Sequence, residues 1–285
     1  MKGIILAGGT GTRLYPVTQV VSKQLMPVYD KPMIYYPLST LMLAGIREIL
    51  IITTPHDQAQ YKALLGDGTQ WGLRLEYCVQ ERPEGVAQAL ILGEQFLDGG
   101  PCTLILGDNL FYGEGLPAMI KKGIQTNQGA TIFGYYVSDP QAYGVIEFDA
   151  EGKVVSLEEK PKQPKSHFAV PGIYIFNGSA SQYAREQAPS PRGELEITDL
   201  NLRYLAEGQL HAVQLGRGIA WLDTGTHKTL LQAANFIRTI IERQGLQIGS
   251  PEEVAYRAGW ISKAELLALC QKYGKNDYGS YLTSL

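Results

Sequence analysis

Short apolar runs alternate with amphipathic stretches through the first 128 residues of the chain. Most runs are uninterrupted, which is typical of strands that are buried on both faces, and the amphipathic stretches between them predict helices. The predicted strands span 2–7, 48–53, 73–79 and 102–107, and the predicted helices span 32–45, 57–65 and 86–97. Strands and helices that alternate at this length indicate a doubly wound, mainly parallel sheet with helices on both faces.

The pattern changes after residue 128. Short strands with tight turns predict a lobe that is inserted into the same domain. The predicted strands are 131–137, 144–148, 154–158, 172–176, 210–215 and 219–222, and one helix is predicted over 195–206. From residue 228 onward, apolar residues on one helical face and two capping boxes, Ser250–Glu253 and Ser262–Glu265, predict only helices. We therefore predict a first domain over 1–227, made of a part over 1–128 and the lobe over 129–227, and a helical extension over 228–285.

A glycine-rich loop follows the first predicted strand. Residues 8–12 hold three glycines and two threonines, and Arg13 and Lys23 follow. Glycines let backbone N–H groups converge on an anion, and the two cations suit phosphate oxygens, so this loop predicts phosphate binding. It is not a P-loop, which ends in Gly-Lys-Ser/Thr, nor a dinucleotide fingerprint, which needs glycine where Leu14 stands. The alternative is a tight strand-to-helix turn whose glycines serve geometry alone.

Two aspartates follow apolar stretches. Asp108 follows the run 102–107, and Asp223 follows the run 219–222. Mg²⁺ prefers one or two carboxylates together with phosphate oxygens and water, so the pair suits a magnesium site. The two residues are far apart in the sequence, and we expect a parallel sheet to bring both strand ends to the glycine loop. The alternative is that Asp108 caps the next turn and Asp223 forms an Asx-turn with Gly225.

Bulk composition excludes several classes of protein. The chain has 285 residues with 25 basic and 28 acidic side chains, so no basic excess indicates nucleic acid or an anionic membrane. No apolar run approaches the roughly 20 residues of a membrane helix. The three cysteines, Cys78, Cys102 and Cys270, are widely spaced and predict reduced core thiols in a cytoplasmic protein. The four histidines have no metal-ligand spacing, and we expect them to be structural or exposed.

The run from Gly8 to Leu14, together with Ser22-Lys23-Gln24-Leu25-Met26-Pro27, resembles the signature of the sugar-phosphate nucleotidyltransferases. Within that family the chain is most similar to the glucose-1-phosphate thymidylyltransferases. The resemblance runs through nearly the whole chain. It implies a three-layer α/β fold with a mixed, mostly parallel Rossmann-like sheet. It also implies that dTTP and α-D-glucose 1-phosphate react to dTDP-glucose and pyrophosphate, with Mg²⁺ as cofactor.

The resemblance assigns roles to residues of this sequence. It implies nucleotide binding by Gly8, Gly9, Thr10, Gly11, Thr12, Arg13, Lys23, Gln24, Gln80, Gly85 and Asp108. It implies sugar-phosphate binding by Asn109, Tyr143, Gly144, Glu159, Lys160, Val170, Tyr174 and Trp221. It implies catalytic roles for Arg13, Lys23, Asp108 and Lys160, and Mg²⁺ ligation by Asp108 and Asp223. The Gln80 amide offers the donor and acceptor that the imide edge of thymine or uracil requires.

The resemblance further implies a homotetramer whose extension supplies subunit contacts. A second site for a dTDP-sugar effector is expected near Arg217, the Tyr112-Gly113 turn and residues 250–256. Three alternatives are weighed. A uridylyltransferase stays open, because the sequence does not measure tolerance for a ribose 2′-hydroxyl. A non-catalytic sensor of the same fold would lose a cation or an aspartate, and none of the four is lost. A NAD-dependent oxidoreductase would need a third glycine in place of Leu14.

Overall fold

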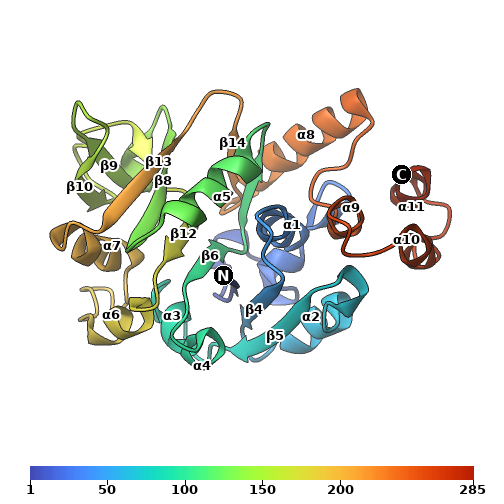
Figure 1. Ribbon diagram of the computed structural model, residues 1–285, viewed down its shortest axis with the longest axis horizontal. Helices are drawn as coiled ribbons and strands as arrows, with labels where there is room; N and C mark the ends of the chain where they lie inside the picture. The colour runs from blue at the N-terminus through green and yellow to red at the C-terminus, as the bar shows by residue number, and fades with distance from the viewer.

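A ten-stranded mixed sheet is the central layer of the structure, a computed structural model that describes residues 1–285 (Figure 1). The strands lie in the order β10-β9-β11-β8-β12-β6-β1-β4-β5, with β13 beside β8. Their bounds are β1 Lys2–Ala7, β4 Glu48–Thr53, β5 Arg74–Val79, β6 Cys102–Leu106, β8 Ala130–Tyr136, β9 Gly144–Phe148, β10 Val154–Glu159, β11 Phe168–Ala169, β12 Ile173–Phe176 and β13 Leu210–Leu215. The neighbours β5, β4, β1 and β6 pair in parallel, and the strands β8 to β12 pair antiparallel.

Helices cover both faces of this sheet. One face carries α1 (Tyr35–Leu43), α2 (Gln58–Leu65) and α5 (Leu116–Thr126). The other face carries α3 (Gln88–Leu92), α4 (Glu94–Leu97), α6 (Ala180–Glu186) and α7 (Ile197–Ala206). Successive strand residues point to opposite faces, so Ile5 packs under the first set of helices and Ile4 under the second. This two-sided burial explains the uninterrupted apolar runs and confirms the predicted three-layer fold.

A separate two-stranded ribbon lies beside the carboxyl end of β6. It pairs β7 (Asn109–Tyr112) with β14 (Ala220–Asp223) in antiparallel register, so that Asn109 lies opposite Asp223. The expectation that a parallel sheet alone brings Asp108 and Asp223 together is therefore wrong. The parallel strand β6 delivers Asp108, and the antiparallel ribbon delivers Asp223 to the same place.

The last part of the chain is helical, as predicted. It consists of α8 (His227–Gln244), α9 (Pro251–Arg257), α10 (Lys263–Cys270) and α11 (Asp277–Ser284). In Figure 1 the red helices α10 and α11 lie at the opposite end of the molecule from the β9–β10 lobe. Ser262 and Glu265 form the predicted capping box of α10. At α9 only half of the predicted box forms: Ser250 accepts from the Glu253 backbone, but the Glu253 carboxylate pairs with Arg257 at 2.6 Å.

Two predicted helices have different bounds in the structure. The helix predicted from residue 32 begins at Tyr35, because Lys31–Pro32 form the short strand β3, which pairs with β2 (Pro27–Val28). The helix predicted over 86–97 is divided into α3 and α4 at Gly93, where a side-chain carbon would lie 2.8 Å from Ile4 Cδ1. The lack of a side chain lets this segment lie close to β1. Not one of the helices combines the length and apolar character needed to cross a membrane.

Candidate functional site

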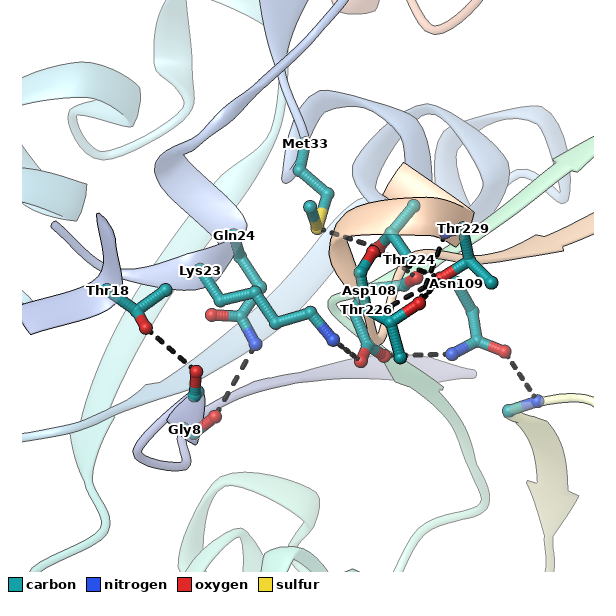
Figure 2. Close-up of polar contacts among 12 residues, drawn as sticks. Gly8, Thr18, Lys23, Gln24, Met33, Asp108, Asn109, Thr224, Thr226 and Thr229 are labelled. Carbon is teal, nitrogen blue, oxygen red and sulfur yellow. Dashed lines mark hydrogen bonds and ion pairs between the residues drawn. The ribbon is translucent and has the colours of Figure 1, made fainter. Parts of the chain in front are cut away.

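The glycine-rich loop leaves β1 at its carboxyl end and is shaped by bonds within the protein. Gly9 and Gly11 have φ angles of 92° and 59°, a region that favours glycine. Thr18 donates to the Gly11 carbonyl at 2.8 Å, and Gln24 donates to the Gly8 carbonyl at 3.4 Å (Figure 2). The loop is thereby held in an open curve with its backbone facing the carboxyl edge of the sheet.

Asp108 lies in the turn between β6 and β7 and is bonded on several sides. Lys23 donates to one carboxylate oxygen, and the Asn109 amide donates to the other at 2.8 Å (Figure 2). The Thr224 hydroxyl donates to the Asp108 carbonyl at 2.8 Å. This last bond joins the turn after β14 to the turn after β6, and it holds the Asp223 segment beside Asp108.

Asp223 has no such cation of its own. A side-chain carbon at Gly225 would lie 3.1 Å from the Asp223 carboxylate and 3.3 Å from the Arg13 guanidinium, so both groups reach the same turn. Burial and the neighbouring Asp108 charge raise the pKa of Asp223, although Lys23 and Arg13 act against this. Burial also opposes ionisation of Asp108, but the charge and hydrogen bond of Lys23 prevail and lower its pKa. The two aspartates therefore share a site without sharing an electrostatic environment.

The carboxylate pair fits a magnesium ion that also takes phosphate oxygens. No three or more histidine, cysteine or acidic side chains are grouped so that they could hold a metal ion by themselves. Mg²⁺ does not need such a cage, since one or two carboxylates and substrate phosphates suffice. Two acidic side chains, one of them with a raised pKa beside the other, are an arrangement that a divalent cation stabilises.

A cavity of about 300 Å³ opens beside the two aspartates, and all eight predicted sugar-phosphate residues line it. These residues are Asn109, Tyr143, Gly144, Glu159, Lys160, Val170, Tyr174 and Trp221. Arg13, Asp108 and Asp223 line the same cavity. The structure thus brings together groups from the glycine loop, the ribbon and the lobe.

Hydrogen bonds fix the orientation of several cavity side chains. Thr198 donates to one Glu159 oxygen at 2.7 Å, and Lys160 pairs with the other at 2.9 Å. The Trp221 indole donates to Asn109 Oδ1 at 2.7 Å, and the Tyr143 ring packs edge-on against Trp221 with centroids 5.0 Å apart. A carboxylate, an ammonium group and an aromatic wall next to each other suit a phosphorylated sugar.

A second, smaller cavity of about 190 Å³ lies on the other side of the glycine loop. Gly9, Thr10 and Gln80 line it, together with Thr54, Pro55, Glu81 and Pro83. Gln80 is 5% exposed, and its amide oxygen lies so close to Gly8 that a side-chain carbon there would be 2.3 Å away. Gly8 therefore has to be glycine for Gln80 to reach the loop.

Six of the predicted nucleotide-binding residues line neither cavity: Gly8, Gly11, Thr12, Lys23, Gln24 and Gly85. Lys23 is turned to Asp108, and the Gln24 amide oxygen lies 3.2 Å from the hydroxyls of Ser22 and Tyr61. Gly85 has a φ of 106°, and a side-chain carbon there would lie 2.4 Å from the Leu195 carbonyl oxygen. Close packing against Leu195 is thus a structural reason for glycine at this position, and nucleotide contact by these residues stays a prediction.

Sequence reasoning missed the contribution of residues 188–198 to the larger of these two cavities. Arg192, Glu194, Glu196 and Thr198 line it from the loop before α7 and from the first turn of α7. Arg192 pairs with Glu196 at 2.7 Å. The only signal in the sequence is the short charged run Arg192-Gly193-Glu194-Leu195-Glu196, which by itself is typical of an exposed loop. Arg192 adds a third cation to the cavity after Arg13 and Lys160.

A third cavity, of about 630 Å³, lies between α1, β7, the start of α5 and α9. Of the residues expected at a second site, Tyr112, Gly113, Ser250, Glu253 and Val254 line it. The other expected residues do not: Arg217, Pro251, Glu252, Ala255 and Tyr256. We call this the regulatory-side cavity, after the effector site that the resemblance predicts, and the 300 Å³ cavity the catalytic-side cavity, after the catalytic residues that it predicts.

Comparison with known proteins agrees with the resemblance found in the sequence. The family model described as nucleotidyl transferase matches residues 2–240. Glucose-1-phosphate thymidylyltransferases of Xanthomonas campestris pv. campestris (strain B100) and Neisseria gonorrhoeae are 61% and 54% identical to the chain. Both alignments span 100% of the chain. They span 96% of the Xanthomonas relative and 99% of the Neisseria relative.

Two solved structures share the fold. A putative glucose-1-phosphate thymidylyltransferase from Bacillus anthracis, in complex with a sucrose, has a TM-score of 0.77 and 42% identity over 84% of this chain and 95% of that chain. A UDP-glucose pyrophosphorylase complexed with UDP-glucose has a TM-score of 0.73 and 26% identity over 84% of this chain and 98% of that chain. The fold, the glycine loop with its paired aspartates and the full-length likeness lead to one conclusion: the chain belongs to the nucleotidyl transferase family.

Proposed function

We propose that the chain joins dTTP and α-D-glucose 1-phosphate to give dTDP-glucose and pyrophosphate. The observation that carries this proposal is the lining of the catalytic-side cavity. Arg13 suits the phosphates of a nucleoside triphosphate, and the two aspartates suit the metal ion that accompanies them. In the same cavity, Glu159 and Lys160 suit a sugar phosphate. The names of the curated relatives, at 54% and 61% identity over the full chain, support dTTP and glucose 1-phosphate as the substrates.

The reaction is an in-line displacement at the α-phosphorus. An oxygen of the sugar phosphate forms the new P–O bond as the bond to pyrophosphate breaks, so no covalent enzyme intermediate is required. The chain contributes positioning and charge neutralisation. Lys160 holds and aims the sugar phosphate, and Glu159, fixed by Thr198, accepts from a sugar hydroxyl. Arg13 stabilises the charge that develops on the departing pyrophosphate.

We propose Mg²⁺ as the cofactor, with Asp108 and Asp223 as its protein ligands. The ion supplies Lewis-acid neutralisation of phosphate charge when it is bound. Lys23 keeps Asp108 ionised and therefore ready to ligate. Arg13, whose charge acts on Asp223, limits the repulsion between carboxylate and phosphate oxygens.

The regulatory-side cavity supports a further part of the proposal. We assign it to a dTDP-sugar effector in a homotetramer whose subunit contacts involve the helical extension. The wall formed by α9 carries Ser250, Glu253 and Arg257, which offer polar groups to such a ligand.

We also propose that the protein is located in the cytoplasm, because Cys78, Cys102 and Cys270 are all free thiols.

The decisive experiment is pyrophosphate release from glucose 1-phosphate with dTTP, UTP, CTP and ATP in parallel. We expect dTTP to give the highest kcat/KM. A preference for UTP would favour the second candidate, a uridylyltransferase, which the structural likeness to the UDP-glucose pyrophosphorylase keeps in consideration. Binding of dTDP-glucose without turnover of any nucleotide would instead indicate a sensor and overturn the proposed activity.

A further inference from the structure

Gln80, the glutamine of the smaller cavity, is hydrogen-bonded to a second glutamine. Gln88, in the first turn of α3, accepts from Gln80 Nε2 through its Oε1 at 2.6 Å. The same Oε1 accepts from the Glu84 backbone N–H at 3.2 Å, and Gln88 Nε2 donates to the Glu84 carboxylate at 2.8 Å. Gln88 does not line either of the two substrate cavities and belongs to none of the residues assigned above.

The orientation of the Gln88 amide follows from the chemistry of Glu84. A backbone N–H is always a donor, and an exposed carboxylate at neutral pH is always an acceptor. Gln88 must therefore turn its oxygen to the Glu84 N–H and its nitrogen to the Glu84 carboxylate. The Gln88 amide is thus fixed with its oxygen toward Gln80. Because that oxygen can only accept, Gln80 must present its nitrogen to Gln88.

The Gln80 oxygen is left on the side of the glycine loop, against Gly8. There it can accept a hydrogen bond from the base of a nucleotide in the smaller cavity. Thymine and uracil carry an N–H at ring position 3, which this oxygen matches, whereas cytosine carries an acceptor there and is repelled. A freely rotating Gln80 would satisfy either base, since its amide could present the nitrogen instead.

The segment that carries Glu84 is itself fixed to the lobe. The Glu84 carbonyl accepts from the Leu195 N–H at 2.7 Å, and the Ala87 N–H donates to the Leu195 carbonyl at 3.1 Å. Gly85, between them, permits this contact because it has no side chain to strike Leu195. The polarity of the glutamine pair thus depends on an anchored backbone, not on a mobile loop.

We propose that Gln88, oriented by Glu84, is a positioning residue that fixes the acceptor face of Gln80 and so selects imide-bearing pyrimidines over cytosine. This inference rests on the proposed function in one respect, namely that a pyrimidine nucleotide occupies the cavity beside Gln80. In this proposal Gln88 influences which nucleotide base is selected, although it does not contact the base.

The test is the variant Gln88→Met, which keeps the length of the side chain and removes the acceptor. kcat/KM is measured by pyrophosphate release for dTTP and dCTP, and the affinity for each nucleotide is measured by calorimetry without sugar phosphate. We expect the preference for dTTP over dCTP to fall about tenfold or more, with a gain for dCTP and an unchanged KM for glucose 1-phosphate. An equal loss with both nucleotides, or an unchanged preference, would overturn the proposal.

Two further variants separate orientation from folding. The double variant Gln88→Glu/Glu84→Gln keeps an acceptor facing Gln80 and returns the donor to the other side, so it should restore the dTTP preference. Its failure to do so, in a folded protein, would also count against the proposal. Gln182→Met is the matched control, since Gln182 forms the same kind of pair with Glu186, at 2.8 Å on α6.

The binding arm distinguishes this inference from the proposed activity. A wild-type chain that binds dTTP more tightly than dCTP without turnover would overturn the activity, and the effect of Gln88→Met on that binding preference would still decide the role of Gln88. A wild-type chain that binds neither nucleotide would overturn both.

Discussion

The catalytic-side and regulatory-side cavities are both lined by residues of the β7–β14 ribbon and differ in both size and chemistry. The regulatory-side cavity is the larger, about 630 Å³ against about 300 Å³. Its walls are mainly apolar or neutral, with Tyr36, Phe111 and Trp260 among them. The catalytic-side cavity is lined by three cations and several carboxylates, among them Asp108 and Asp223. Volume alone would favour the regulatory-side cavity for chemistry, whereas the density of charge favours the catalytic-side cavity, in line with the proposed function.

The ribbon connects the two cavities physically. Along β7, Asn109 lines the catalytic-side cavity, while Phe111 and Tyr112 line the regulatory-side cavity. Along β14, Trp221 lies opposite Phe111 and also contacts Asn109. The proposed effector in the larger cavity would contact the same strand that carries a catalytic-side residue, and we expect this strand to couple the two proposed sites. The following predictions test whether the two cavities have these different roles.

The largest effect is expected when the paired carboxylates lose their charge. Asp108→Asn and Asp223→Asn should each lower kcat by roughly 10²-fold or more, because a metal that neutralises phosphoryl charge contributes several kcal/mol. The double variant should be little worse than either single variant, since groups that act as a unit are not additive. Turnover is measured across a Mg²⁺ titration. Effects that multiply, with no shift in the Mg²⁺ requirement, would contradict a shared ion; Asp277→Asn, on exposed α11, is the control.

A smaller effect is expected at Lys160. Lys160→Ala should raise the KM for glucose 1-phosphate by about tenfold or more and leave dTTP affinity nearly unchanged, because the ammonium group is paired with Glu159, where we propose that the sugar phosphate binds. Kinetics with varied sugar phosphate and calorimetry with dTTP measure the two quantities. The exposed Lys162, two residues further on and outside the cavity, provides the control variant Lys162→Ala. Equal weakening of both ligands would contradict the assignment.

How far the sequence predicts this molecule differs between its parts. The strands β4, β9 and β13 begin and end at the predicted residues, because burial in the sheet follows the local pattern of apolar residues. The ribbon was not predicted, since β7 is short and its partner β14 lies more than a hundred residues later in the chain. Pairing over such distances leaves no trace in local periodicity.

The residues of the site likewise differ in how far the sequence predicts them. Residues in recognisable runs, such as Glu159 and Lys160, were predicted from resemblance and line the cavity. Arg192 was missed because its loop has no periodicity and no apolar flank. The regulatory-side cavity has walls from α1, β7, α5 and α9, so only the fold assembles it. The partnership of Gln80 with Gln88 likewise becomes visible only once α3 is placed against β5.

A modest effect is expected on the regulatory side. Arg257→Ala should weaken inhibition by dTDP-glucose several-fold and leave kcat and both KM values unchanged, because Arg257 lines the larger cavity and does not line the catalytic-side cavity. Its partner Glu253, one helical turn away, is 11% exposed and also accepts from the Tyr281 hydroxyl at 2.8 Å, so the carboxylate keeps a hydrogen-bond partner in the variant. The control is Arg238→Ala, which breaks the same kind of pair, with Glu242 on α8. Inhibition that is purely competitive with dTTP and insensitive to Arg257→Ala would contradict a second site.

The smallest effect concerns thermal stability and separates the two carboxylates from each other. Burial and the Asp108 charge raise the pKa of Asp223 above its ordinary 3.8, so the folded state loses stability as pH rises through that raised value. Asp223→Asn removes this loss and should raise Tm at pH 7, with a difference that vanishes below about pH 3.8. Although burial opposes it, the Lys23 pair lowers the pKa of Asp108, so its contribution is present at neutral pH and is lost as pH falls through the lowered value.

Asp108→Asn should therefore lower Tm at pH 7, because it leaves Lys23, which is 9% exposed, without its carboxylate. Each shift is expected to be about 2–4 °C, which corresponds to roughly 1 kcal/mol in a chain of this size. Melting curves in EDTA from pH 3 to 8 measure both differences without metal binding, which would otherwise stabilise the wild type selectively. Shifts of the same sign for both variants would show that the two carboxylates occupy equivalent environments. Opposite signs would show that the protein neutralises Asp108 itself and leaves Asp223 to be neutralised by a ligand.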